Sequence, residues 1–361
     1  MTDPLHGIVS PVFTVDSQLS RDLGRDCVRL EIEEGIEGLR TLQAHFLAVG
    51  AGATGPRGQL LYLDGSVLDF GKPVQVSLGP DGGQRTVFDG VISAIEAVYG
   101  DSEPPRVMVL AEDALMRLRM TRRMRTYTNV TDADIAQQLA GEHGLQTDIT
   151  ADGPRYDVVQ QLNQSDLAFL RERARLIQAE LWCTSRTLHF STRPNRTGTA
   201  LTLVRGNQLL RARLRADLAH QRSSVLVGGY DARAKDVISE QADASAVSAE
   251  ASTGRTGARI VEQALGASAS IRVRDVALTT AEASAWAKAE MLRRGRRFVT
   301  VAGLTRGSPE MVVGSLLRLE EVGPPFEGDG YYVTRVRHTY DNVTGLRTNF
   351  DAERATINEV A

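Results

Sequence analysis

The sequence predicts an α+β protein that is mainly β. Three observations predict this class. Residues 1–115 hold short apolar runs separated by Gly, Pro and Asp, residues 116–200 show helical spacing, and strand-like runs return over 201–361. Short strands at near-regular spacing are typical of barrels and sandwiches, whereas the change of period in the middle predicts a compact α/β region inserted between two strand-rich domains.

The first domain is predicted from alternation. Val28–Glu33 alternates apolar and polar residues, as a half-buried strand does. Turn-forming residues bound the other apolar runs and indicate hairpins. Further strands are expected at Ala44–Val49, Leu60–Leu63, Val74–Leu78, Arg85–Ile92 and Arg106–Leu110.

The middle region is predicted to hold two helices and a hairpin. Asp132–Glu142 carries apolar residues at helical spacing, with Thr131 or Asp132 as its cap and glycines at 141 and 144 to end it. Ser165 is a suitable cap for a second helix, in which Leu167, Leu170, Ala174 and Ile177 share one face. The runs at 181–183 and 188–190 flank a turn and predict a hairpin.

The last part resumes strands around one helix. Thr279 and Glu282 form a capping box that predicts a helix start. The segment 237–257 is rich in Ala, Ser and Gly, which predicts a mobile loop. Strands are expected at Leu201–Val204, Ser224–Val227, Met311–Val313, Leu316–Leu319, Tyr331–Tyr340 and Leu346–Phe350.

Composition argues against several classes of function. The net charge is -3 and the pI about 6.1, without the overall basic balance typical of nucleic-acid binders. No apolar run reaches the roughly 18 residues of a membrane span. The first ten residues lack the pattern of a signal peptide, so we expect synthesis in the cytoplasm. Cys27 and Cys183 are expected to be reduced and buried.

Two glycine-rich stretches resemble nucleotide-binding motifs only weakly. Gly50–Gly55 has the spacing of the dinucleotide fingerprint, but no helix pattern follows to hold a pyrophosphate. Gly65–Lys72 is one residue too long for a phosphate loop, and Pro73 stands where Ser or Thr is required. The six histidines have no metal-ligand spacing. We therefore expect no catalytic residue, cofactor site or metal site, and no enzymatic activity.

The densest basic cluster is the one candidate interface. It consists of Arg117, Arg119, Arg122, Arg123 and Arg125. Such a cluster can bind phosphates, so a DNA-binding module stays an alternative. No aromatic stacking platform is interleaved with the arginines, and guanidinium groups also pair well with carboxylates across protein interfaces. A protein interface is the favoured interpretation.

Five segments in order resemble the phage late control gene D family, which also supplies the N-terminal part of VgrG proteins of type VI secretion and related injection particles. The first is the run Arg-Thr-Val-Phe-Asp-Gly-Val-Ile-Ser-Ala-Ile at 85–95, and the last is Gly-Asp-Gly-Tyr-Tyr-Val-Thr at 328–334, followed by His338 and by Thr-Gly at 344–345. Between them lie 126–136 with His-Gly-Leu at 143–145, then 161–170, then 225–231.

The resemblance implies a baseplate hub of a contractile, phage-tail-like injection system. The resemblance implies two similar β-barrel tube domains that carry an inserted α/β region. Three copies form a ring with a central channel, which joins a hexameric inner tube to a trimeric spike. The implied partners are two further copies, the inner tube protein, the spike protein and other baseplate components. Membrane insertion and specific nucleic-acid binding are not implied.

Two further expectations concern the assembled particle. A VgrG protein would continue beyond the position of Ala361 into a needle, so the spike is expected to be a separate polypeptide. The mature location is expected to be the tail baseplate of a virion or of a phage-tail-like particle. A cell-envelope hydrolase is the alternative from another class of function, although nothing in the sequence resembles a lysozyme domain.

Overall fold

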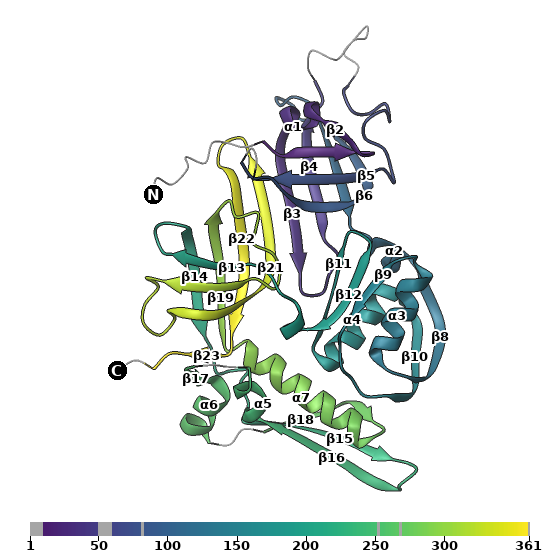
Figure 1. The fold of residues 1–361 in the computed structure, drawn as a ribbon, viewed down its shortest axis with the longest axis vertical. Helices are drawn as coiled ribbons and strands as arrows, with labels where there is room; N and C mark the ends of the chain where they lie inside the picture. The colour runs from purple at the N-terminus through teal and green to yellow at the C-terminus, as the bar shows by residue number, and fades with distance from the viewer. Residues whose placement is uncertain (1–9, 50–59, 81–82, 251–252, 267–268, 360–361) are drawn as a thin grey trace.

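The computed structural model describes residues 10–49, 60–80, 83–250, 253–266 and 269–359 (Figure 1). Strands dominate, most of them in large antiparallel sheets, and helices gather in the middle of the chain and before the last strands. This confirms the α+β, mainly β class.

One sheet runs through both ends of the chain. Its strands follow the order β14-β19-β22-β21-β3-β4-β7-β6-β5-β1-β2, and β13 and β20 branch from β21. The N-terminal strands are β1 (Val12–Val15), β2 (Gln18–Ser20), β3 (Cys27–Gly35), β4 (Thr41–Leu47), β5 (Pro73–Leu78), β6 (Arg85–Val98) and β7 (Arg106–Glu112), with α1 at Arg21–Asp26. The C-terminal strands are β13 (Ala200–Val204), β14 (Leu209–Ala216), β19 (Val299–Arg306), β20 (Leu316–Glu320), β21 (Gly328–Asp341) and β22 (Gly345–Arg354).

The two halves meet where β3 pairs antiparallel with β21. Each half has its own apolar core: Phe13, Phe46 and Phe88 are fully buried in the first, and Tyr331 is fully buried in the second. Between the described strands, no pairing closes either half into a barrel. The sheet thus joins two separately packed halves through one shared strand pair.

The inserted region folds around a third core. Its elements are α2 (Met116–Met120), β8 (Arg122–Val130), α3 (Asp132–Glu142), β9 (Gln146–Ile149), β10 (Tyr156–Ser165), α4 (Asp166–Ile177), β11 (Ala179–Thr184), β12 (Thr187–Thr192) and the 3-10 turn η1 (Arg193–Asn195). Both predicted caps are confirmed, since the Thr131 and Ser165 side chains accept hydrogen bonds from the amides of Asp134 and Ala168. The predicted hairpin at 181–190 is confirmed by the β11–β12 pair.

The predicted loop at 237–257 is wrong. These residues form most of β16 (Asp236–Asp243), all of α5 (Ala244–Ser248) and all of β17 (Arg255–Thr256), and residues 251–252 lie outside the described part. Val247 is fully buried and packs where α7 carries Gly295, which leaves room for it. Small residues here permit close packing, which composition alone does not distinguish from mobility.

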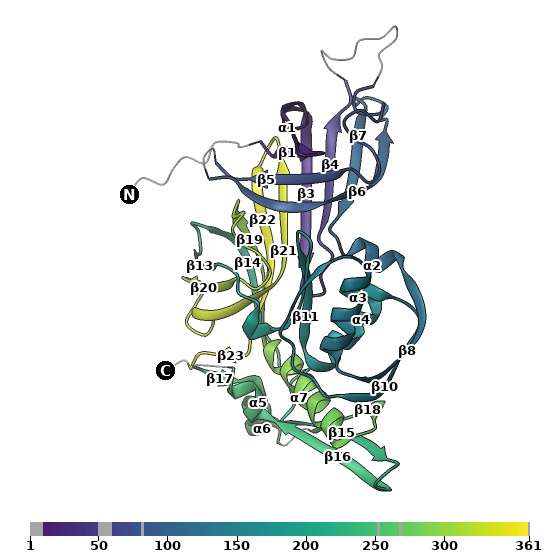
Figure 2. The ribbon, with the colours of Figure 1, turned by 45° about the vertical axis from the view of Figure 1, so that its right-hand side comes forward.

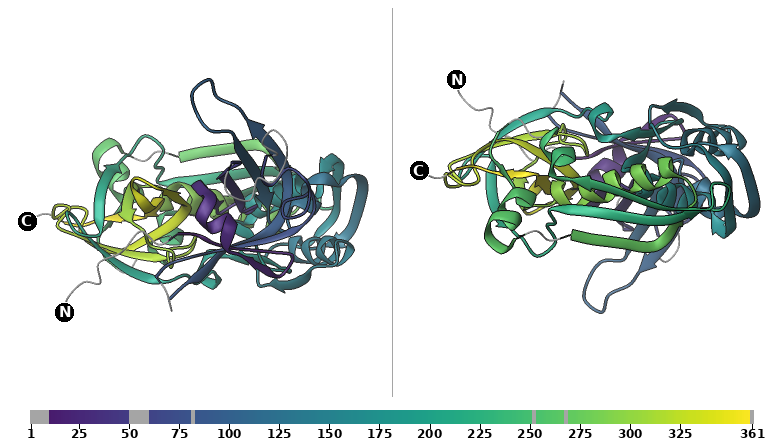
Figure 3. Two further views of the ribbon diagram at one scale, coloured as in Figure 1. Left: turned by 90° about the horizontal axis from the view of Figure 1, so that it is seen from above. Right: turned by 90° about the horizontal axis from the view of Figure 1, so that it is seen from below.

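These elements belong to a small layer at the end of the molecule. The strand β15 (Ser224–Asp231) pairs with β16 and with β18 (Ala269–Ala277), and α7 (Thr280–Arg296) packs on this sheet (Figures 1 and 3). Half of the predicted capping box of α7 forms: the Glu282 amide donates to the Thr279 hydroxyl, whereas the Glu282 carboxylate accepts from the Leu278 amide. Helix α6 (Gly257–Leu265) and the pair of β17 with β23 (Thr356–Ile357) complete the layer.

Two predicted strands are absent, and several observed strands were not predicted, among them β8, β10, β14, β18 and β19. Leu60–Leu63 and Met311–Val313 form turns or irregular backbone that is nevertheless buried at Tyr62 and Met311, so their apolar character reflects core packing rather than strand pairing. The strand β8 lies within the arginine cluster, where charged residues obscure the alternation.

Candidate assembly interfaces

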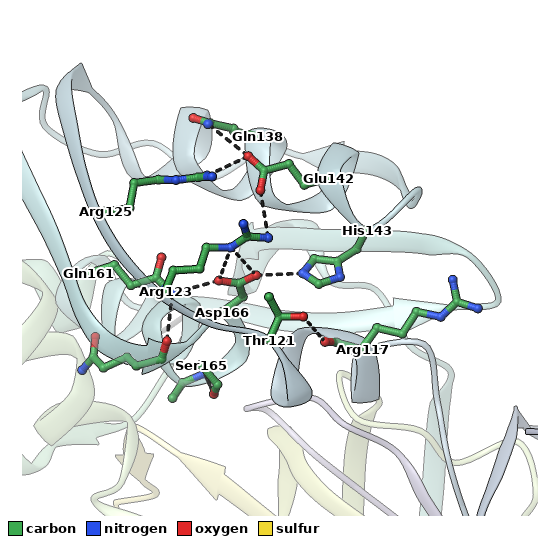
Figure 4. Close-up of polar contacts among 12 residues, drawn as sticks. Arg117, Thr121, Arg123, Arg125, Gln138, Glu142, His143, Gln161, Ser165 and Asp166 are labelled. Carbon is green, nitrogen blue, oxygen red and sulfur yellow. Dashed lines mark hydrogen bonds and ion pairs between the residues drawn. The ribbon is translucent and has the colours of Figure 1, made fainter. Parts of the chain in front are cut away.

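The centre of the predicted arginine cluster is bonded inside the chain. Arg123 lies on β8, and its Nε donates to both carboxylate oxygens of Asp166 at 3.0 and 2.9 Å (Figure 4). Asp166 is fully buried at the start of α4, where it also accepts from Gln161 Nε2 at 2.8 Å and lies 2.8 Å from His143 Nε2. A buried carboxylate with this many partners fixes β8 against α3, whose C-cap is His143, and α4, which begins at Asp166.

Arg125 repeats the arrangement nearer to the surface. Its Nη1 donates to Glu142 at 2.7 Å, and Arg123 reaches the other oxygen of the same carboxylate at 2.9 Å. Burial opposes ionisation of Glu142, but the hydrogen bonds from Arg125 and Gln138 and the nearby guanidinium charges hold its pKa below the ordinary value. The Arg125 guanidinium also lies 5.7 Å from the centre of the Tyr127 ring.

The other three arginines of the cluster are exposed. Arg119 donates to Glu112 at 2.5 Å, and Arg122 Nε donates to the side-chain oxygen of Asn163 at 3.2 Å. Among the described residues, the Arg117 side chain has no hydrogen-bond or ion-pair partner; only its carbonyl accepts a bond, from Thr121 (Figure 4). The cluster therefore divides into two internal arginines and three surface arginines, and of the surface group only Arg117 and Arg122 lack a carboxylate partner in the described part of the chain.

A second group of arginines locks the inserted region to both halves of the sheet. Arg196 follows η1 and donates to Glu34 of β3 at 2.6 Å and to Glu180 of β11 at 3.1 Å. Its guanidinium lies 4.3 Å from the Trp182 ring. Glu34 also accepts from Arg40 at 2.5 Å, and all these charges are buried or nearly so.

Arg193 extends this junction to the C-terminal half. It donates to Glu353 of β22 at 2.6 Å and lies 3.4 Å from Glu180, with its guanidinium 4.1 Å from the Tyr332 ring. The Tyr332 hydroxyl donates to Glu180 at 2.8 Å, and burial raises the pKa of that tyrosine. Buried charges are costly unless each is paired, so separating these pairs would be strongly unfavourable. The junction therefore holds the inserted region, the N-terminal half and the C-terminal half of the sheet at one angle.

A third row of arginines stands on the edge strand β14. Arg211, Arg213 and Arg215 alternate with Ala212 and Leu214, which pack toward the C-terminal core. The side chains of Arg211 and Arg213 have no hydrogen-bond or ion-pair partner in the described part of the chain, whereas Arg215 bonds Asp217. The Arg211 and Arg213 side chains line a hollow of about 480 Å³. Arg335, Arg337 and Asp351 line the same hollow.

The same face of the sheet stays polar across the shared strand pair. Arg335 and Arg337 of β21 both bond Glu33 of β3 at 2.7 Å. Desolvation would raise the pKa of Glu33, but these hydrogen bonds and charges keep it below its ordinary value. Arg213 and Arg215 also line a second hollow, of about 790 Å³, which reaches Glu33 and Gly38. The result is a hollowed, charged face that spans both halves.

Eight strands carry this face, from β6 to β14, and every neighbouring pair among them is antiparallel. On β14, pairing is recorded only with β19, apart from one isolated bridge at Leu209. At the other end, β5 pairs with β6 over residues 85–91 and the Ile92 backbone still bonds residues 71 and 72, so residues 93–98 have a described strand neighbour on one side only. Among the described residues the run therefore ends in two unpaired edges.

The weak motifs have structural explanations where the structure describes them. Lys72 donates its Nζ to the carbonyls of Gly65, Ser66 and Val67, so it holds a loop closed. The glycine motif at 50–55 lies outside the described residues. Cys27 and Cys183 are free and buried, as predicted, and burial raises the pKa of each thiol to about 12.

Within the described residues, no cluster of three or more His, Cys, Asp or Glu side chains is placed to hold a metal ion. Likewise, no described helix combines the length and apolar character needed to cross a membrane.

Sequence reasoning missed both the buried junction and the β14 row. The junction pairs Arg196 with a glutamate 162 residues away, a separation that no local pattern reveals. The β14 row did carry a signal, since Arg211, Arg213 and Arg215 alternate with apolar residues at the period of a strand.

Comparison with known proteins places the chain in a family. The family model described as the Alg8 N-terminal domain matches residues 58–342, so the chain belongs to that family. No curated protein matches the chain.

Solved structures share the fold at low sequence identity. The 43 kDa tail protein of prophage MuSo2 from Shewanella oneidensis is 14% identical, with a TM-score of 0.69 over 96% of this chain and 98% of that one. A tail protein from Neisseria meningitidis MC58 is 12% identical, with a TM-score of 0.62 over 96% of each chain. An Escherichia coli component of the type VI secretion system, itself similar to bacteriophage T4 tail proteins gp27 and gp5, is 13% identical, with a TM-score of 0.53 over 93% of this chain and 76% of that one.

Proposed function

We propose that this member of the Alg8 N-terminal domain family is a non-enzymatic baseplate hub subunit of a contractile, phage-tail-like injection system. In this proposal three copies form a ring with a central channel, which joins a hexameric inner tube to a trimeric spike. The fold it shares with the tail proteins of two bacterial species supports a place in a tail. The observation that carries the ring is the eight-strand antiparallel run with an unpaired edge at each end.

The number of strands favours continuation between copies. Because eight is even and every pair is antiparallel, β14 of one copy and β6 of the next run in opposite directions when the copies are related by rotation. The two edges can then pair as an ordinary antiparallel ladder, which removes both exposed edges. Such a contact is heterologous, and a ring closes it.

The two halves of each chain also explain how a ring of three copies could join a sixfold tube to a threefold spike. Each half gives four strands to the run, β6-β7-β4-β3 and β21-β22-β19-β14. Three copies would place six four-strand units around one axis, opposite six tube subunits, while the ring keeps threefold symmetry for the spike. The buried junction around Arg196 supports this role, because it holds the two halves at one angle.

The face between the hollows has the chemistry of a channel wall. It carries Arg213, Arg335, Arg337 and Glu33 rather than an apolar stripe, so it can stay in contact with water. At the proposed copy–copy contact, Arg213 would lie on the same face as Glu96 of the next copy, since Glu96 pairs with Met108 and Met108 with His45 on that face. Opposite charges on neighbouring strands favour the pairing.

Disulfide trapping tests the ring. Arg213→Cys is combined in one chain with Ala94→Cys, Glu96→Cys or Val98→Cys, which scan three registers on the same face of β6. Assembled particles are oxidised and resolved by denaturing electrophoresis. At least one register should give a ladder that ends at three chains, because paired strands bring the Cα atoms within the roughly 4.4–6.8 Å that a disulfide spans.

The native cysteines do not confuse this test, since both are buried. Arg213→Cys with Val343→Cys is the matched control, because Val343 is 91% exposed in the turn between β21 and β22. A ladder that continues to six chains, or no cross-link in any register above the control, would refute the ring.

A further inference from the structure

The outer face of the β8–β10 pair is uncovered and apolar. Met124 and Leu162 stand directly opposite each other in the antiparallel register and are 75% and 60% exposed. Val158, two register steps along on β10, is 50% exposed. The opposite face of this pair packs on α3 and α4 through buried Tyr127 and Val159 (Figure 2). One apolar face of this two-stranded sheet is covered by the core of the inserted region, and the other apolar face is left exposed to solvent.

Another exposed methionine lies beside this face. Met120, at the end of α2, is 68% exposed. The helix is tied to the start of β8 because the Thr121 hydroxyl donates to the Arg117 carbonyl at 3.1 Å. Single exposed apolar residues are ordinary, but Met124, Val158 and Leu162 share one face of the β8–β10 pair and Met120 stands two residues before β8, and such a group marks an interaction surface. Methionine adapts its shape to a partner, which suits such a surface.

The rim of the surface is positively charged. Arg122 precedes Met124 on the same face, and its side-chain bonds go only to Asn163, so no carboxylate neutralises it. Arg117 is exposed and has no side-chain partner among the described residues. Thr126, Thr128 and Gln160, which complete the face, are uncharged. The occupant of this surface should therefore bring carboxylates to its edge.

We propose that Met120, Met124, Val158 and Leu162 form a docking surface for a segment of a different polypeptide, one that has apolar side chains at its centre and Asp or Glu at its rim. The strand pairing proposed for the ring uses β14 and β6 and involves neither β8 nor β10. An interface of ordinary size, about 800 Å² per partner, covers both the apolar group and the arginines at 117 and 122.

Site-specific photo-cross-linking in the producing cells tests this proposal. A benzoylphenylalanine replaces Val158, and cross-linked peptides are identified by mass spectrometry. One polypeptide other than this chain should be captured, and the captured segment should contain apolar residues flanked by Asp or Glu. The double variant Met124→Glu with Leu162→Glu should lower the cross-link yield about tenfold or more, and Arg122→Glu should lower it severalfold.

Two controls separate docking from folding and from the ring. Val343→Glu places a carboxylate at an equally exposed apolar position elsewhere and should leave the yield unchanged. The disulfide ladder of the ring, measured in the Met124→Glu, Leu162→Glu background, should persist. The proposal is overturned if the cross-link goes to another copy of this chain, if the captured segment is basic, if no partner is captured, or if the Met124 and Leu162 replacements leave the yield unchanged. If the ladder is absent while the cross-link forms, only the ring fails.

Discussion

Two rows of arginines, at 117–125 and at 211–215, differ in what their charges meet. In the first row Arg119, Arg123 and Arg125 bond carboxylates of the same chain, and the Asp166 that Arg123 bonds is fully buried. In the second row Arg211 and Arg213 have no partner in the described part of the chain. The first row is denser in the sequence, yet only two of its five arginines lack a carboxylate partner in the described part of the chain, against two of three in the second row.

The difference shows that density is a poor guide to an arginine's role. Arg123 is internal because a carboxylate 43 residues later folds against it. Arg213 is free because its strand lies at the edge of the sheet. The interface role predicted for the first row is therefore proposed only for its exposed members, Arg117, Arg119 and Arg122.

The strongest test of this contrast is Arg123→Met. Removing the guanidinium leaves Asp166 buried with only His143 and Gln161, so the free energy of unfolding should fall by about 3 kcal/mol. Chemical denaturation of the purified chain measures this loss. Arg122→Met is the matched control on the neighbouring residue and should change the free energy by less than about 0.5 kcal/mol. Equal effects of the two replacements would break the contrast.

The second row should respond in the opposite way. Arg211→Glu with Arg213→Glu should leave the free energy of unfolding within about 0.5 kcal/mol of the parent, since both side chains are exposed. The yield of the trimeric disulfide ladder should fall about tenfold, because the carboxylates would repel Glu96 of the next copy. This variant carries its trapping cysteines at Arg215→Cys and on β6. A folded variant with an unchanged ladder yield, or a large loss of stability, would contradict this assignment.

The helices α3, α4 and α7 could be predicted closely, whereas the shorter helices and the long-range contacts could not. Thr131, Ser165 and Thr279 act as caps because capping is decided within four residues, which a sequence displays directly. By contrast, the segments 60–63 and 311–313 have the composition of strands but form turns or irregular backbone. Their backbone conformation depends on the residues that pack against them, which the local sequence does not show. The tightly packed Val247 was hidden for the same reason, in a segment whose small residues resemble a linker.

The candidate surfaces follow the same division. The alternation in β14 was visible, but its place at the edge of a sheet depends on β19 and β22, which lie about a hundred residues further along. The apolar face of β8 and β10 was invisible, because Met124 and Leu162 become neighbours only through their register.

A smaller effect separates the rows by pH. The pKa of Glu142 is lowered in the folded chain, so its ionised form contributes stability above the ordinary value of 4.5 that is lost as the pH falls through the folded pKa. Glu142→Gln removes this contribution. The decline of unfolding free energy between about pH 6 and pH 3 should therefore be shallower in the variant than in the parent chain. The same pH dependence in variant and parent would show that the Glu142–Arg125 ion pair adds nothing to stability. Arg211 and Arg213 have no carboxylate partner in the described part of the chain, so no such pH dependence is expected from them.

The most direct measurement of the proposed hub is a reconstruction of the assembled particle without imposed symmetry. The account predicts three copies of this chain around the axis, β14 of each paired with residues 93–98 of the next copy's β6, and the face of Arg213 and Arg337 turned toward the channel. Six copies around the axis, or three copies whose β14 edges face solvent, would contradict it.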